Sequence, residues 1–480
     1  MADRLLKFVS VERAAPEKRD PTDRRDDFGE IYRDFRPERA AEQAARCSQC
    51  GIPYCQVHCP LANNIPDWLM LAANGRMAEA YAVAAATNTF PEICGRICPL
   101  DRLCEGNCVI EKDFGGVTIG AVETYITEPA FAEGWVEPPR PRRELDRSVA
   151  IIGAGPGGLA AADRLRRRGY RVEVHDRYDR IGGLLVYGIP NFKLEKHVVA
   201  RRAALLEDGG VVFHTDFEVG RDASLDELRA RHDAVLVATG VYQYRDAAMP
   251  GAGLSGIVQA MDYLTASNRK GLGDAVADFD SGLLDARGKH IVVIGGGDTG
   301  MDCVRTAVRQ QAKSVTCLYR RDRDNMPGSQ REVTHAIEEG VVFEWLAAPE
   351  AFLGNGAVSG VRAQRTRLGS PDADGRQTPK PVPGSSFTLD CDLAIKALGF
   401  DPEDLPGAFG APELRLSRHG TLKVSEASMM TSLDGVFAAG DIVRGASLVV
   451  WAIKDGRDAA DGIDAHLDAK AARHAAVAAE

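Results

Sequence analysis

Eight of the eleven cysteines in this chain of 480 residues lie between residues 47 and 108. They form two groups, Cys-x2-Cys-x4-Cys-x3-Cys-Pro and Cys-x3-Cys-Pro-x5-Cys-x3-Cys, which consist of Cys47, Cys50, Cys55 and Cys59, then Cys94, Cys98, Cys104 and Cys108. Eight thiolates are the number that two four-ligand metal centres require, and sulfur ligands select iron-sulfur clusters, zinc or copper(I) over hard cations. The cysteines therefore predict two metal centres.

The spacing favours iron-sulfur clusters over zinc. The first group is similar to the bacterial ferredoxin run Cys-x2-Cys-x2-Cys-x3-Cys-Pro, although its middle gap is four residues long. Zinc sites most often use Cys-x2-Cys pairs, and this stretch has one such pair. Disulfides would need an oxidising compartment, whereas the chain begins Met1-Ala2-Asp3-Arg4 without an apolar signal segment. We therefore expect a cytoplasmic protein with reduced thiols.

In the ferredoxin pattern, three neighbouring thiolates bind one cluster and the fourth binds another. This pattern predicts two ligand sets, Cys47, Cys50, Cys55 and Cys108 for one cluster, and Cys59, Cys98 and Cys104 for the other. The last ligand stays open, because Cys94 completes the count but the carboxylate of Glu123 could take its place. If the later cysteines lie on helices, each pair with a three-residue gap shares one helix face.

A glycine-rich loop follows the cysteines, between an apolar strand over residues 148–152 and a helix that starts near Leu159. Its sequence is Gly153-Ala154-Gly155-Pro156-Gly157-Gly158, in the strand-turn-helix setting that a dinucleotide-binding fingerprint requires. Gly153 permits the tight turn, Gly155 lets the backbone approach a pyrophosphate, and Gly158 lets the helix pack closely on the strand. The next strand ends at Asp176, whose carboxylate is placed to accept from ribose hydroxyls.

A second loop, Gly295-Gly296-Gly297-Asp298-Thr299-Gly300, has the same setting. The strand after it, over residues 314–319, ends in Arg320 and Arg321 where the first domain has an acid. Arginine at this position can bind a 2′-phosphate through a pair of hydrogen bonds, so the second loop predicts NADPH. A solvated charged turn is the alternative, since Asp322 and Asp324 alternate with the arginines.

Three further segments are similar to the FAD-binding half of flavoproteins with two dinucleotide-binding domains. They are Ile181-Gly182-Gly183-Leu184-Leu185, Val235-Leu236-Val237-Ala238-Thr239-Gly240 and Val436-Phe437-Ala438-Ala439-Gly440-Asp441. In those proteins the final acid, here Asp441, contacts the ribityl chain or the pyrophosphate of the flavin. Residues 110–480 hold no close cysteine pair of the kind that disulfide reductases of this fold use. Electrons must therefore leave the flavin by another route, and we expect no catalytic side chain.

These patterns predict an α/β fold with two Rossmann-like dinucleotide-binding domains, one inserted in the other, after a small helical iron-sulfur domain. The expected parts are a charged N-terminal arm (1–40), a helical double-cluster domain (41–145), an FAD-binding domain (146–286 and 408–480) and an NADPH-binding domain (287–407). The arm is either a solvated tail or a segment that docks on a partner. A net charge of -10 argues against nucleic-acid binding, and no apolar run is long enough to span a membrane.

Over nearly its whole length the chain resembles the small (beta) subunits of bacterial NADPH-dependent glutamate synthases, within the family of FAD/NADPH iron-sulfur oxidoreductases related to dihydropyrimidine dehydrogenase. The resemblance is carried by the cysteines, both glycine loops, Tyr187-Gly188-Ile189-Pro190, Tyr319-Arg320-Arg321 and Ala438-Ala439-Gly440-Asp441. It implies FAD, NADPH and two [4Fe-4S] clusters. It also implies a hetero-oligomer with a large (alpha) subunit, which carries FMN and makes glutamate from glutamine and 2-oxoglutarate.

Dihydropyrimidine dehydrogenase uses a glutamine as a cluster ligand in a similar segment, at the position that matches Glu123, and this resemblance puts Cys94 in doubt. Relatives with the same electron-input architecture use other acceptors. The alternative function is therefore a subunit of an NADPH:ferredoxin-type or pyrimidine-reducing oxidoreductase. Two alternatives of other classes are a zinc-stabilised docking module on a flavin oxidase and a scaffold with vestigial nucleotide sites. The intact glycines of both loops argue against the scaffold.

Overall fold

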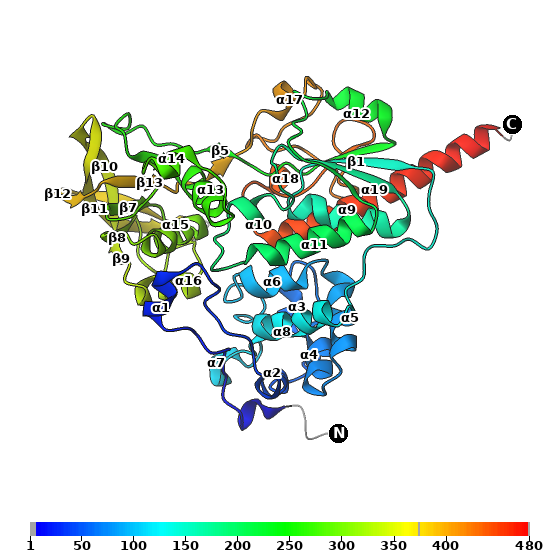
Figure 1. Cartoon of the computed structure of the whole chain (residues 1–480), viewed down its shortest axis with the longest axis horizontal. Helices are drawn as coiled ribbons and strands as arrows, with labels where there is room; N and C mark the ends of the chain where they lie inside the picture. The colour runs from blue at the N-terminus through cyan, green and yellow to red at the C-terminus, as the bar shows by residue number, and fades with distance from the viewer. Residues whose placement is uncertain (1–5, 373–374, 479–480) are drawn as a thin grey trace.

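The computed structural model describes residues 6–372 and 375–478 (Figure 1). The ends of the chain and residues 373–374, which belong to the expected arm and the two expected nucleotide-binding domains, lie outside these ranges. A helical N-terminal part lies at the bottom of Figure 1, with one parallel sheet above it and a second at the left. Among the described residues, no helix has the length and apolar character needed to cross a membrane.

The N-terminal part consists of short helices. Prolines occupy the first or second position of α1, α2, α4 and α6, where a residue without an amide donor is tolerated. Gly95 and Gly120 let α6 and α8 approach closely, since a Cβ on Gly95 would lie 2.8 Å from the Gly120 carbonyl oxygen. The helices are η2 (Lys7–Val9), α1 (Pro21–Asp26), α2 (Pro37–Ala44), α3 (Tyr54–Val57), α4 (Ile65–Ala73), α5 (Met77–Thr87), α6 (Pro91–Ile97), α7 (Glu111–Phe114) and α8 (Ile119–Ala132).

The first sheet is parallel and has the strand order β15-β4-β1-β2-β3. Its central strands β1 and β4 are fully buried, as expected for a parallel sheet covered on both faces. The strands are β1 (Ser148–Ile152), β2 (Arg171–His175), β3 (Val212–His214), β4 (Ala234–Val237) and β15 (Val436–Ala438). The helices of this part are α9 (Pro156–Arg168), α10 (Leu184–Tyr187), α11 (Lys196–Asp208), α12 (Leu225–Arg231), α17 (Leu405–Ala408), α18 (Asp441–Arg444) and α19 (Val449–Ala478).

The second sheet is also parallel, in the order β6-β13-β7-β8-β9, and lies between β4 and β15 in the sequence. The predicted fold class, with one dinucleotide-binding domain inserted in the other, is therefore confirmed. The strands are β6 (Ile257–Gln259), β7 (His290–Ile294), β8 (Ser314–Tyr319), β9 (Val342–Trp345) and β13 (Leu393–Lys396). The helices are α13 (Ala260–Gly271), α14 (Ala277–Asp280), α15 (Asp298–Arg309) and α16 (Gln330–Glu338).

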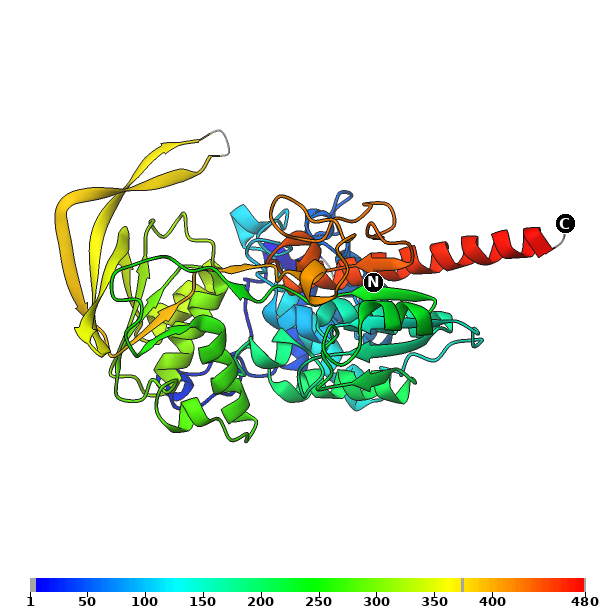
Figure 2. The same ribbon diagram turned by 90° about the horizontal axis from the view of Figure 1, so that it is seen from above.

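Strand β6 precedes residue 287, where the inserted domain was expected to begin, and pairs with β13 in the second sheet. The sequence does not indicate that β6 belongs to the inserted domain, because this strand has three residues, all half-buried. Two short strands connect the sheets, β5 (Gln243–Tyr244) and β14 (Phe400–Asp401). An antiparallel sheet follows β9, and its last two strands extend away as a ribbon (Figure 2): β10 (Ala347–Asn355), β11 (Ala357–Pro371) and β12 (Gln377–Asp390).

The charged arm docks on the helices of the second sheet, where α1 lies beside α16 (Figure 1). Arg24 of α1 is 1% exposed and donates to Glu338 Oε2 at 2.8 Å and to Glu339 Oε1 at 3.3 Å. The Tyr32 hydroxyl lies 3.1 Å from His335 Nε2. The solvated-tail alternative therefore does not hold for α1, because Arg24 is buried against a distant part of the same chain. Docking of the arm on a partner stays a prediction.

Candidate functional site

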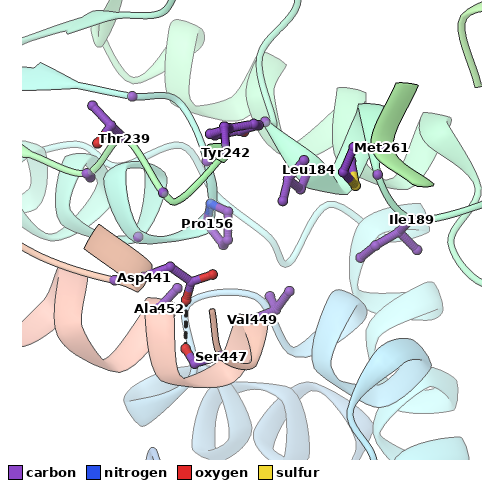
Figure 3. A pocket seen from close by; sticks show the side chains of 18 of the residues that line it. Pro156, Leu184, Ile189, Thr239, Tyr242, Met261, Asp441, Ser447, Val449 and Ala452 are labelled. Carbon is purple, nitrogen blue, oxygen red and sulfur yellow. Dashed lines mark hydrogen bonds between the residues drawn. The ribbon is translucent and has the colours of Figure 1, made fainter. Parts of the chain in front are cut away.

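A cavity of about 340 Å³ lies where the two sheets and the cysteine-bearing helices meet. Figure 3 shows Thr239, Tyr242 and Asp441 toward one end and Ile189 and Met261 toward the other. The lining of the same cavity includes three groups of predicted residues from distant parts of the chain: the first glycine loop, Asp298 and Thr299 of the second loop, and Cys98. One space therefore connects both nucleotide-binding loops with the cysteines.

The first loop has the local geometry of a dinucleotide fingerprint. Gly153 has a φ of 111°, and a Cβ there would lie 2.4 Å from the Ala238 carbonyl oxygen. A Cβ on Gly158 would lie 1.9 Å from the Gly153 carbonyl oxygen, so the helix packs on the turn as predicted. A Cβ placed on Gly155 would have no atom within 4 Å, and Gly155 lines the cavity. The loop thus leaves an open cradle at the N-terminus of α9, which fits a pyrophosphate.

Asp176 lies at the end of β2 and lines the same cavity. Its carboxylate accepts from the Ala154 amide at 2.6 Å and the Tyr178 amide at 2.8 Å, which ties it to the glycine loop. Burial raises the pKa of Asp176 above its usual value. A hydrogen-bond donor from a ligand would therefore stabilise the ionised carboxylate.

The three further segments predicted for the flavin also reach this cavity. Gly183 has a φ of 53° and its Cβ position is 3.0 Å from Gly155 Cα, so the two loops approach closely. Thr239 precedes Gly240, and its buried hydroxyl has no hydrogen-bond partner among the described residues. Asp441 follows Gly440 and accepts from Ser447 Oγ at 2.7 Å (Figure 3). The unpaired hydroxyl of Thr239 fits a cavity that holds a polar ligand.

Several residues of this cavity carry no signal in the sequence. The Arg177 guanidinium lies 4.6 Å from the centre of the Tyr242 ring and 2.9 Å from Glu403 Oε1. These three residues and Ser447 line the cavity beside the predicted glycines. They are single residues far apart in the chain, so no local pattern marks them.

The second loop repeats the geometry of the first. Gly295 has a φ of 135°, and a Cβ there would lie 2.2 Å from the Ala397 carbonyl oxygen. A Cβ on Gly297 would have no atom within 4 Å. A Cβ on Gly300 would lie 2.7 Å from the Gly295 carbonyl oxygen. Asp298 accepts from the Ser329 amide and pairs with Arg102 at 2.9 Å, so its side chain ties the loop to the cysteine-bearing part. Thr299, beside it, lines the cavity.

Arg320 and Arg321 lie directly after β8, as predicted. Their backbone is held by β11 and by the turn before β10, since the Arg320 carbonyl accepts from Thr366 Oγ1 at 2.7 Å and the Arg321 carbonyl from the Leu346 amide at 3.0 Å. Arg320 is exposed, and the buried Nε of Arg321 has no partner among the described residues. Two guanidiniums on a fixed backbone therefore remain able to bind an anion.

The structure brings four of the cysteines together as one set, which we call the outer set: Cys47, Cys50, Cys55 and Cys108. Burial and the nearby thiols of Cys108 and Cys47 raise the pKa of Cys55 to about 12. Burial also raises the pKa of Cys47, with added effects from Cys108 and Cys50. Cys50 and Cys108 are half-buried, so this set lies near the surface.

The inner set consists of Cys59, Cys98 and Cys104, with both Cys94 and Glu123 beside it, and Cys98 lines the cavity. Burial raises the pKa of Cys104 well above its usual value, and the charges of Cys59 and Glu123 add to this effect. Burial raises the pKa of Glu123 to about 8. The nearby Cys94 thiol lowers the pKa of Cys98, although burial and Glu123 raise that pKa overall. Buried acidic groups of this kind fit a bound cationic centre.

Cys94 lies on α6, which ends at the cap residue Cys98, whereas Cys104 and Cys108 lie in turns and not on a helix. The chain folds back tightly here, because both the Glu105 and the Gly106 amides donate to the Leu100 carbonyl. A Cβ on Gly106 would lie 1.8 Å from the Asp101 carbonyl oxygen. These turns carry the two later cysteines into different sets.

Glu173, His175 and His214 are the one group of three potential ligands among the described residues whose ligand atoms all lie within 4.8 Å of one another. The two imidazole rings stack at 11°, and parallel rings do not direct their lone pairs at one ion.

Known proteins match the chain over nearly its full length. Residues 24–135 match the family described as dihydropyrimidine dehydrogenase domain II, 4Fe-4S cluster, and residues 147–456 match the pyridine nucleotide-disulphide oxidoreductases. The glutamate synthase [NADPH] small chain of Azospirillum brasilense is 66% identical over 478 residues, which cover 99% of each chain. The chain belongs to the glutamate synthase [NADPH] small-chain family. The resemblance inferred from the sequence is therefore confirmed.

The small chain from Escherichia coli K12 is 46% identical over 468 residues, which cover 96% of this chain and 99% of that one. Solved structures share the fold: Mycobacterium tuberculosis FprA in complex with NADPH has a TM-score of 0.57 and 21% identity, covering 69% of this chain and 86% of that chain. Together, these matches make the protein an NADPH-dependent flavin iron-sulfur oxidoreductase.

Proposed function

We propose that this chain oxidises NADPH on FAD and passes the electrons through two [4Fe-4S] clusters to a large glutamate synthase subunit, which makes L-glutamate from L-glutamine and 2-oxoglutarate. The partners would form a hetero-oligomer in the cytoplasm. The observation that supports this most is the single cavity lined by the first glycine loop, by Thr299 of the second loop and by Cys98. FAD, when bound, converts a two-electron hydride into the single electrons that clusters carry.

The roles of the nucleotide-binding residues follow from their places in the cavity. Gly155 and the N-terminus of α9 would hold the FAD pyrophosphate, and Asp176 would accept from the adenosine ribose. Asp441 would contact the ribityl chain or the pyrophosphate. The glycine loop before α15 would hold the NADPH pyrophosphate, and Arg320 and Arg321 would bind its 2′-phosphate.

We assign the outer set to one cluster and the inner set to the other, with Glu123 as the fourth ligand of the inner cluster. Support for Glu123 comes from its burial and from the effect of its charge on the pKa of both Cys59 and Cys104. Because Cys98 lines the cavity and both Cys50 and Cys108 of the outer set are half-buried, the inner cluster would receive electrons first and the outer cluster would release them.

The proposal is tested first by the iron, zinc, acid-labile sulfide and FAD content of the anaerobically purified protein. We expect about eight irons, about eight sulfides and one FAD per chain. Two zincs without sulfide would contradict the proposal and leave the cysteines with a structural role. With NADPH and an artificial acceptor, the chain alone should turn over but make no glutamate.

Three exposed apolar side chains, close in sequence to the outer set, are suited to contacting the large subunit. Ile52, Val57 and Val109, which are close in sequence to the outer cysteines, are 66%, 63% and 52% exposed. Exposed apolar groups around a surface-facing redox centre are typical of a contact face.

Replacing Val57 with glutamate should lower NADPH-dependent glutamate formation with the large subunit at least about tenfold, because a charge would be buried in the interface. Reduction of ferricyanide by NADPH should stay within about twofold of wild type, since it needs no partner. Val342→Glu is the matched control, because Val342 is 54% exposed on β9 and far from the cysteines in sequence. Equal losses in the two variants would count against this docking face.

A further inference from the structure

Asn88 lies between the two side chains that compete for the last place in the inner set. Its side chain is almost fully buried, at the C-terminal end of α5. The amide nitrogen donates to Glu123 Oε1 at 3.1 Å, and the amide oxygen accepts from the Cys94 thiol at 3.6 Å. One residue therefore contacts both Glu123 and Cys94.

The backbone determines which way the Asn88 amide points. The oxygen and nitrogen of an amide are told apart by their partners. The Phe90 amide, which can only donate, lies 3.0 Å from Asn88 Oδ1, so the oxygen must face it. The Asn88 backbone is itself held, since its amide donates to the Ala84 carbonyl. The nitrogen is thereby turned toward Glu123.

This orientation has a different effect on each neighbour. The hydrogen bond from Nδ2 occupies Oε1 of Glu123, and among the described residues it is the one hydrogen bond recorded for that carboxylate. The second carboxylate oxygen is left for the centre formed with Cys59, Cys98 and Cys104. The oxygen of Asn88 has no proton to give, so it holds the Cys94 side chain by accepting a hydrogen bond from its S–H.

We propose that Asn88 is a positioning residue, which presents Glu123 as the fourth ligand of the inner cluster and holds Cys94 outside the ligand set. The inference rests on the proposed function, because it requires a cluster on the inner set. Residues that orient a ligand from behind affect the potential and spectrum of a metal centre as well as its affinity. An effect confined to one of two clusters therefore distinguishes positioning from a general loss of stability.

The test compares Asn88→Ala, Glu123→Ala, Cys94→Ala and the control Asn74→Ala in the full-length protein, purified anaerobically. Asn74 is also in the N-terminal part, where its side chain caps α4 by donating to the Met70 carbonyl. For each variant we would measure iron and sulfide content, the EPR spectra of the reduced clusters and their midpoint potentials.

We expect N88A and E123A to change the spectrum and shift the potential of the same single cluster. C94A should keep the full iron content, and N74A should match wild type. Asn88→Leu, which retains the buried volume, serves as a second variant if N88A does not bind FAD.

Two wild-type cluster spectra in N88A or N88L would overturn the inference. Loss of about half the iron in C94A, or a change in different clusters in N88A and E123A, would also overturn it. Loss of FAD and both clusters together in N88A and N88L would contradict it as well, since positioning acts on one cluster. Failure of the proposed function is distinguishable, because wild-type protein would then contain no iron and sulfide.

Discussion

Replacing Glu339 with alanine is expected to lower the free energy of unfolding by about 3 to 5 kcal/mol. This carboxylate is 1% exposed, and it accepts from Arg305 at 2.9 Å, Arg309 at 2.7 Å and Arg24 at 3.3 Å. All three guanidiniums are buried, so removal of the acid leaves them without their shared partner in a medium of low polarity. The loss would also loosen the docking of the arm on α15 and α16.

The adjacent Glu338 provides a matched control for this prediction. Its side chain is 31% exposed and pairs with Lys18 and Arg24. Because solvent screens this pair, E338A should cost about 1 kcal/mol or less. Urea unfolding of the FAD-loaded variants, followed by tryptophan fluorescence at neutral pH, measures both effects. Similar losses of unfolding free energy in the two variants would show that the buried network stabilises the fold no more than the half-exposed pair does.

The same network predicts how stability depends on pH. Burial alone would raise the pKa of Glu339, but hydrogen bonds from Arg309 and Arg305 hold it at about 2. The carboxylate therefore stabilises the fold fully above its usual pKa of 4.5, and this contribution is lost as the pH falls toward 2. The stability difference between wild type and E339A should accordingly shrink on acidification below pH 4.5.

The second large effect concerns nucleotide choice. Replacing Arg320 and Arg321 together with alanine should lower kcat/KM for NADPH by about 100-fold or more, and change kcat/KM for NADH by less than about threefold. The reason is the loss of charge-assisted hydrogen bonds to the 2′-phosphate, worth about 1.5 to 3 kcal/mol each. Reduction of ferricyanide, assayed with each nucleotide, gives both values without the large subunit.

Arg323 is the control for this experiment, because it lies in the same charged segment. Its guanidinium is directed toward α16, with Nε 3.2 Å from Gln330 Oε1 and Nη2 3.4 Å from Thr334 Oγ1. R323A should retain the NADPH preference of wild type. An equal loss of kcat/KM with NADPH and NADH in the double variant would contradict binding of the 2′-phosphate by Arg320 and Arg321.

The sequence by itself determined the features whose chemistry is local. The spacing of the cysteines and the two strand-glycine-helix units depend on residues within a few positions of each other. A positive φ at Gly153 or a close helix at Gly158 is required by the turn itself, wherever the turn lies in the fold. The insertion of one domain in the other can also be inferred from the sequence, because glycine segments typical of the FAD half lie on both sides of the second loop.

Tertiary structure alone decided which distant residues meet. Asn88, at the C-terminal end of α5, reaches Glu123 on α8 across 35 residues of sequence, a contact that no spacing in the sequence records. The charged arm has the composition of a solvated tail, and only the fold supplies Glu339 as the buried partner of Arg24. The physical reason is the same in both cases: burial and pairing are properties of a packed environment, whereas a sequence pattern reports the preferences of neighbouring residues.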